Sequence, residues 1–87
     1  MAAATLYDKI VQVTHVYLGP AADRFIDRQI QNHLHKTPRE VSREDLTQLI
    51  DWIRLAISLI TDDSDIIEEY TEQLYRLAGD SKTNRHG

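Results

Sequence analysis

No cysteine occurs among the 87 residues of this chain. Disulfide bonds, thiolate metal sites and a cysteine nucleophile are therefore excluded. The three glycines are far apart, so the sequence has no glycine-rich phosphate-binding loop. Apolar runs fall short of the length, about 18 residues, that a membrane-spanning helix needs, and the N-terminus lacks the pattern of a signal peptide. We therefore expect a cytoplasmic protein that does not associate with membranes.

The only strong charge asymmetry of the chain is acidic. Residues 1–60 carry 7 basic and 7 acidic side chains, whereas residues 61–78 carry 6 acidic and 1 basic. A nucleic-acid-binding domain of this size normally shows a basic face, so nucleic acid is not the favoured partner. Acidic residues early in a helix interact well with the helix dipole, which explains most of this segment, although it could also attract a basic partner.

Apolar residues recur with helical spacing in four segments, at 5–18, 20–35, 42–60 and 65–78. Their boundaries carry ordinary helix signals, which are the capping pairs Thr5/Asp8 and Ser42/Asp45, a cap at Asp63 or Ser64, the breaks Gly19-Pro20 and Thr37-Pro38, and Gly79. We expect an all-α fold, a small four-helix bundle with the third helix central. One helical domain should cover residues 1–79, followed by a disordered polar tail at 80–87.

The third segment, DLTQLIDWIRLAISLI, is apolar around most of its circumference. One stripe is formed by Leu46, Ile50, Ile53, Ile57 and Ile60, and a second by Leu49, Trp52, Leu55, Ala56 and Leu59. A helix on the surface of a bundle needs only one apolar stripe. Either this helix is covered on two sides within the chain, or one side meets another chain.

Catalytic and metal-binding patterns are weak. His33 and His35 are two residues apart, whereas two metal ligands on one helix face need a spacing of four. The acidic run at 62–65 lacks the ligand spacing and the central glycine of a calcium loop. A helical chain of this length should also struggle to form a cavity of several hundred Å³. We predict no enzyme activity, no cofactor, no metal site and no small-molecule substrate.

The segment Tyr17-Leu18-Gly19-Pro20-Ala21-Ala22 resembles a Tyr-Leu/Ile-Gly-Pro-x-Ala segment in a small helical domain found on bacterial kinases and other signalling proteins. In that family the segment precedes a helix that carries arginines, as Arg24 and Arg28 do in this chain. The 87 residues of this sequence include no kinase domain, and the third helical segment is longer and more apolar than expected for that family. The resemblance implies an interaction module associated with signalling, and it implies no catalytic residue.

We predict a non-catalytic protein–protein interaction or oligomerisation module, a regulatory adaptor whose partner is another protein or a second copy in a homodimer. The predicted contact surface comprises Trp52, Leu55 and Leu59, with Tyr70 or Tyr75 as neighbours on the fourth helix.

Two alternatives remain open. One is a small nucleic-acid-binding transcriptional regulator that uses the third helix, with Arg43 and Gln48, after the Thr37-Pro38 turn. The other is a part of a larger complex in which the acidic fourth helix docks on a basic partner.

Overall fold

The computed structural model describes residues 5–79, and this part of the chain is all helical. Its elements are α1 (Leu6–Leu18), η1 (Gly19–Ala21), α2 (Ala22–His33), η2 (Pro38–Glu40), α3 (Arg43–Ser58) and α4 (Ser64–Leu77), where η marks a short 3-10 helix. The predicted disorder of 80–87 falls outside the described residues.

The predicted capping residues at the starts of α1, α3 and α4 are confirmed. The Thr5 hydroxyl accepts a hydrogen bond from the Asp8 N–H at 3.1 Å, and the Asp8 carboxylate accepts one from the Thr5 N–H at 3.2 Å. Ser42 and Asp45 form the same reciprocal pair at the start of α3, with both bonds 3.1 Å long. Asp63 caps α4 by accepting from the N–H of Asp65 at 3.0 Å. Each of these side chains satisfies backbone donors that have no partner within the helix.

Two helix boundaries differ from the sequence prediction. Pro20 lies within η1 and does not start α2, which begins at Ala22. α2 ends at His33 because His35 adopts a left-handed φ of 56°, and the N–H groups of Leu34 and His35 both donate to the carbonyl of Ile30. Gly19 ends α1 with a positive φ of 63°, which an L side chain rarely adopts.

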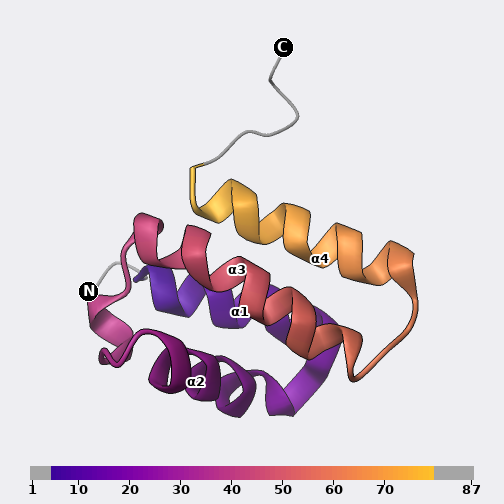
Figure 1. The fold of residues 1–87 in the computed structure, drawn as a ribbon, viewed down its shortest axis with the longest axis horizontal. Coiled ribbons are helices and arrows are strands. Elements are labelled where there is room, and N and C mark those ends of the chain that lie inside the picture. Colours follow the sequence, from indigo (N-terminus) through magenta and orange to yellow (C-terminus); the bar gives the residue numbers. More distant parts are fainter. Residues whose placement is uncertain (1–4, 80–87) are drawn as a thin grey trace.

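Neighbouring helices pack in a ring. α1 packs against α2 and α4, and α3 packs against the same two helices (Figure 1). Successive helices run in opposite directions, as expected for short connections. The prediction that the third helix is central is not confirmed, since α1 and α3 occupy equivalent positions between α2 and α4.

Two tyrosines of α1 tie that helix to its neighbours. Tyr7 donates a hydrogen bond to Asp27 of α2 at 2.6 Å. Tyr17 donates to Glu69 of α4 at 2.9 Å and accepts one from Gln73 at 2.9 Å. Burial and the neighbouring carboxylates raise the pKa of both phenols.

The core contains one buried polar pair between α1 and α4. Thr14 and Tyr70 are both fully buried, and their hydroxyl oxygens lie 2.6 Å apart. Because Thr14 uses its single hydrogen on the carbonyl of Ile10, at 2.8 Å, Tyr70 is the donor of the pair. Burial raises the pKa of Tyr70 to about 12. Around this pair lie the buried apolar side chains Ile10, Ile26, Ile30, Val41, Leu46, Leu49, Ile50, Ile53, Ile57, Ile67 and Leu74.

Candidate functional site

The outer face of α3 carries large apolar side chains that the described part of the chain does not cover. Trp52 is 48% exposed, Leu55 61% and Leu59 89%. Trp52 and Leu55 lie three residues apart on one side of the helix, and Leu59 follows as its C-cap, directly after the last helical residue. We call these three residues the α3 stripe. The opposite side of the same helix is buried in the core through Leu46, Leu49, Ile50, Ile53 and Ile57.

The two apolar stripes seen in the sequence therefore differ in their burial. α3 packs only one broad side between α2 and α4, and this side takes up the first stripe. Leu49, which the sequence placed on the second stripe, is also buried, and Ala56 is half-buried. The exposed stripe is therefore narrower than predicted. Of the two possibilities that the sequence left open, the one in which a side of this helix meets another chain is compatible with this geometry.

Ile60 belongs to the first stripe in the sequence, but unlike the other four residues of that stripe it is not buried. The side chain of Ile60 is 58% exposed, because α3 ends at Ser58. The N–H groups of Leu59 and Ile60 donate to the carbonyls of Ala56 and Ile57, three residues earlier, at 3.1 and 2.9 Å. Such bonds tighten the last turn, so residues beyond it no longer follow the angular spacing of an α-helix. Ile60 thus adds exposed apolar surface at the end of the α3 stripe.

The imidazole ring of His33 of α2 stacks on the indole ring of Trp52. The two rings are stacked with their centroids 4.1 Å apart and an interplanar angle of 9°. The stack covers one face of the indole and restricts its rotation, while nearly half of the residue stays exposed. A partner that binds Trp52 therefore loses less side-chain entropy than it would on a free ring. The contact of His33 with Trp52 was not predicted from the sequence, because helical spacing within one segment does not reveal contacts between segments.

Of the two tyrosines predicted beside this surface, Tyr70 lies in the core. Tyr70 is fully buried against Thr14, and its ring packs on Tyr17 at 5.1 Å, so it is not part of an exposed contact surface. It belongs to the apolar side of α4 that faces the core, together with Ile67 and Leu74. Tyr75 is half-buried and packs against the same core.

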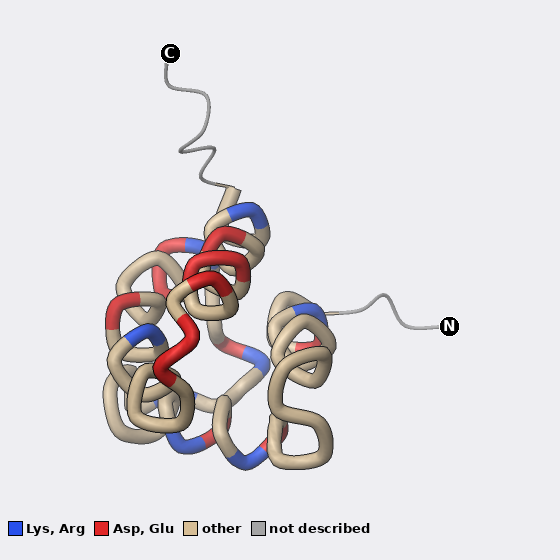
Figure 2. Tube along the Cα trace, turned by 90° about the vertical axis from the view of Figure 1, so that its right-hand side faces the viewer, with Lys and Arg blue, Asp and Glu red and all other residues tan. Residues whose placement is uncertain are grey.

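Acidic side chains gather on α4 and on the loop before it (Figure 2). Glu72 forms an ion pair with Arg76 at 3.7 Å, and Glu69 accepts the hydrogen bond from Tyr17. This acidic face has the composition that the sequence indicated. Its role at the start of α4 is at least partly structural, since Asp63 is the N-cap.

Within residues 5–79, no helix is long and apolar enough to cross a membrane. The same residues contain no group of three His, Cys, Asp or Glu side chains placed to hold a metal ion. No protein-family model matches the chain, and no curated protein or solved structure matches it.

Proposed function

We propose that this protein is a non-catalytic interaction module, built as a small helical bundle, that forms a homodimer through the α3 stripe. The observation that carries the proposal is the exposure of Trp52, Leu55 and Leu59 on one side of one helix. A single exposed leucine is common on monomeric proteins and needs no explanation. A row of three large apolar side chains, extended by Ile60, is typical of a surface that binds another protein.

A second copy of the chain fits this surface by simple geometry. Two copies of α3 that lie antiparallel across a two-fold axis near Leu55 place Trp52 of one copy opposite Leu59 of the other. Each residue pair then occurs twice, as in most symmetric dimers. The antiparallel arrangement also sets the positive end of each helix dipole beside the negative end of its neighbour.

The exposed area supports a weak dimer. Trp52, Leu55 and Leu59 together expose the equivalent of about two whole side chains. Burying a large apolar side chain contributes about 1.5–3 kcal/mol, so two copies gain about 6–12 kcal/mol. Association costs about 4–15 kcal/mol in lost freedom of motion. The most favourable combination of these terms leaves about 8 kcal/mol, so we expect a dimer with a dissociation constant of about micromolar or weaker.

A regulatory role in signalling is the part of the proposal that rests on the resemblance at Tyr17–Ala22. In the structure this segment forms the end of α1, η1 and the first residue of α2, a tight joint between two helices. It lies in the scaffold and supplies no residue of the α3 stripe. The resemblance therefore supports a shared arrangement of helices. It does not bear on the binding surface, which we propose from the exposed residues of the α3 stripe.

The test is the absolute mass in solution, measured by light scattering on a sizing column across a hundredfold range of protein concentration. We expect the mass to rise from monomer towards dimer. The double variant Trp52→Ser/Leu59→Ser should remain a folded monomer at every concentration. Val16→Ser is the matched control, because Val16 is 76% exposed on α1, away from the stripe, and its loss should leave the association unchanged.

Three results would overturn the proposal. A wild-type monomer at millimolar concentration would show that the surface does not self-associate, and the stripe would then serve a different protein. Unfolding of the double variant, seen as loss of helical circular dichroism, would show that these residues belong to the core. Equal loss of association in the Val16 control would show that contacts elsewhere hold the dimer.

The alternative of a nucleic-acid-binding regulator gains no specific support from the fold. Arg43 and Gln48 are exposed on the first half of α3, but the acidic side chains of Glu44 and Asp51 are exposed on the same helix. A fluorescence-polarisation titration with short DNA and RNA duplexes at low salt tests it. Binding that weakens steeply as salt rises would favour this function over the dimer.

A further inference from the structure

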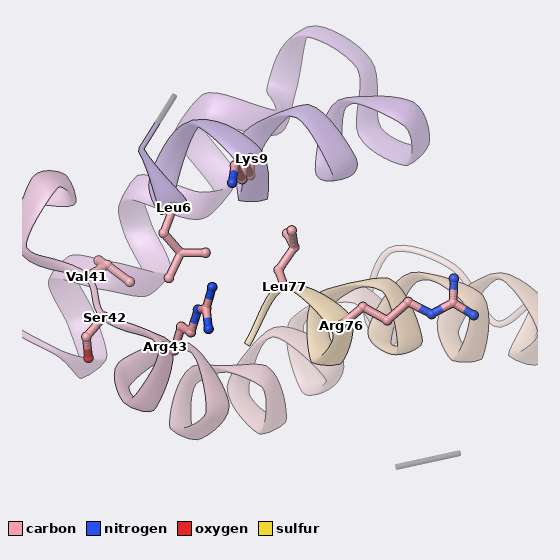
Figure 3. Close-up of a pocket in the computed structure, with 7 residues that line it drawn as sticks. All are labelled: Leu6, Lys9, Val41, Ser42, Arg43, Arg76 and Leu77. Atoms are coloured by element: carbon pink, nitrogen blue, oxygen red, sulfur yellow. The ribbon is translucent and has the colours of Figure 1, made fainter. Parts of the chain in front are cut away.

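A cavity of about 450 Å³ opens where the first turn of α1, the first turn of α3 and the last turn of α4 meet (Figure 3). This volume lies within the range, about 300–1,000 Å³, of small-molecule sites. The sequence-based expectation that so short a chain would struggle to form a cavity of this size is therefore wrong. Three helix ends converge here and leave a space that the core does not fill.

The walls of this cavity combine apolar and basic side chains. The lining residues are Leu6 and Lys9 of α1, Val41, Ser42 and Arg43 at the start of α3, and Arg76 and Leu77 of α4. Three of them are apolar, three are basic, and none of the described residues that line the cavity is acidic. A ligand that suits these walls has a negative charge and an apolar body.

Two of the basic residues that line the cavity, Lys9 and Arg43, form no ion pair with another residue of the described part of the chain. Figure 3 shows the Arg43 guanidinium between Leu6 and Leu77, and Lys9 on the α1 wall above it, whereas the Arg76 side chain extends away from the cavity. Within residues 5–79, ion pairs engage Lys36 and Arg76 but neither Lys9 nor Arg43. No carboxylate within residues 5–79 therefore competes with a ligand for these two cations, which belong to α1 and α3.

The start of α3 adds to the preference for an anion. Ser42, the N-cap of this helix, lines the cavity, so the positive end of the α3 dipole lies at its edge. The guanidinium of Arg43 is planar and can donate two parallel hydrogen bonds to one carboxylate. The ammonium of Lys9 acts as a second, point-like charge on the other side.

We propose that this cavity binds a monocarboxylate with an unbranched apolar chain. The carboxylate lies between Arg43 and Lys9, and the chain packs against Leu6, Val41 and Leu77. The site binds its ligand without chemical change. It lies at the α1, α3 and α4 ends described above and does not depend on the proposed dimer.

The experiment is a titration of the ¹⁵N-labelled protein with sodium octanoate, followed by amide chemical shifts. We expect saturable shifts at Ser42, Arg43 and Leu77 with a dissociation constant of about 1 mM or lower. Acetate supplies the charge without the chain, and octanol supplies the chain without the charge. Each should bind at least about tenfold more weakly than octanoate, because each lacks one of the two contacts.

Point variants locate the carboxylate. Lys9→Gln and Arg43→Gln should each weaken octanoate binding about two- to fivefold, as expected for one partly exposed ion pair. Arg24→Gln is the matched control, since it removes the same kind of charge from an exposed side chain of α2 that does not line the cavity, and it should leave the affinity unchanged.

Several outcomes would refute the proposal. These are no saturable shift with octanoate at 10-fold the expected dissociation constant, equal binding of octanol, or unchanged affinity in both cation variants. Shifts confined to Trp52, Leu55 and Leu59 would also refute it, because the apolar chain would then be bound by the α3 stripe. None of these results bears on self-association, which the sizing experiment measures separately.

Discussion

The exposure of Leu55 and the burial of Ile53, two residues apart on α3, allow a direct test of the surface on which the proposed function rests. Ile53 is fully buried, whereas Leu55 is 61% exposed. Both lie in the middle of the helix, so replacing either by alanine changes helix propensity little. The variants Ile53→Ala and Leu55→Ala therefore differ mainly in how much apolar contact they remove.

The expected free energies are well separated. Removing a fully buried isoleucine side chain costs about 2–5 kcal/mol, because transfer energy is lost and a cavity remains. Full burial of leucine contributes about 1.5–3 kcal/mol, and Leu55 realises well under half of it, so Leu55→Ala should cost about 1 kcal/mol or less. Domains of this kind have a total stability of about 5–15 kcal/mol, so Ile53→Ala removes a large share of it.

Urea denaturation followed by circular dichroism measures both values. The protein should be diluted well below the dissociation constant of the proposed dimer, so that association does not stabilise the folded state. With a slope of about 1–2 kcal/mol per molar urea, the midpoint of Ile53→Ala should fall by about 1–5 M, and that of Leu55→Ala by about 1 M or less. Equal destabilisation by the two variants would show that Leu55 is covered by its own chain, and the α3 stripe would not be a free surface.

Three further predictions concern the residues that hold the fold and the site in place. Because burial raises the pKa of Tyr70 from its ordinary value of about 10 to about 12, the folded state holds this phenolic proton more tightly than the unfolded chain does. The resulting stabilisation, about 2–3 kcal/mol, is present below pH 10 and is lost as the pH rises from about 10 to 12. In urea titrations over this pH range, the free energy of unfolding of Tyr70→Phe should therefore fall less than that of the wild type. Ser42→Ala removes the side-chain acceptor for the N–H of Asp45, so it should lower the free energy of unfolding by about 0.5–2 kcal/mol in the same assay. An unchanged free energy of unfolding would mean that the cap does not stabilise α3. His33→Ala uncovers one face of Trp52, the only tryptophan, so its fluorescence maximum should move to longer wavelength, and an unchanged spectrum would contradict the stacked geometry.

Local sequence signals determined the helices of this protein. The pairs Thr5/Asp8 and Ser42/Asp45 were readable because a capping box involves residues only three positions apart. The sequence predicted that the second helix ends at residue 35, whereas α2 ends at His33, because helical spacing does not reveal the left-handed conformation of His35.

The candidate surface was only partly predictable. Trp52, Leu55 and Leu59 stood out because α3 has more apolar residues than one buried side can hold. Tyr70 could not be assigned from spacing alone, since its position suited both the core and a neighbouring surface. Its burial depends on Thr14, which lies 56 residues away in the sequence and bonds to it across two helices.

The sequence by itself determined an all-helical chain with capped helix starts and an apolar excess on its third helix, because these features arise from interactions over three or four residues. Only the tertiary structure decided which stripe of α3 enters the core, that His33 stacks on Trp52, and that Lys9 and Arg43 face one cavity. These features depend on how helices pack and where their ends meet. Packing is set by many weak contacts between distant residues, and no short-range pattern encodes it.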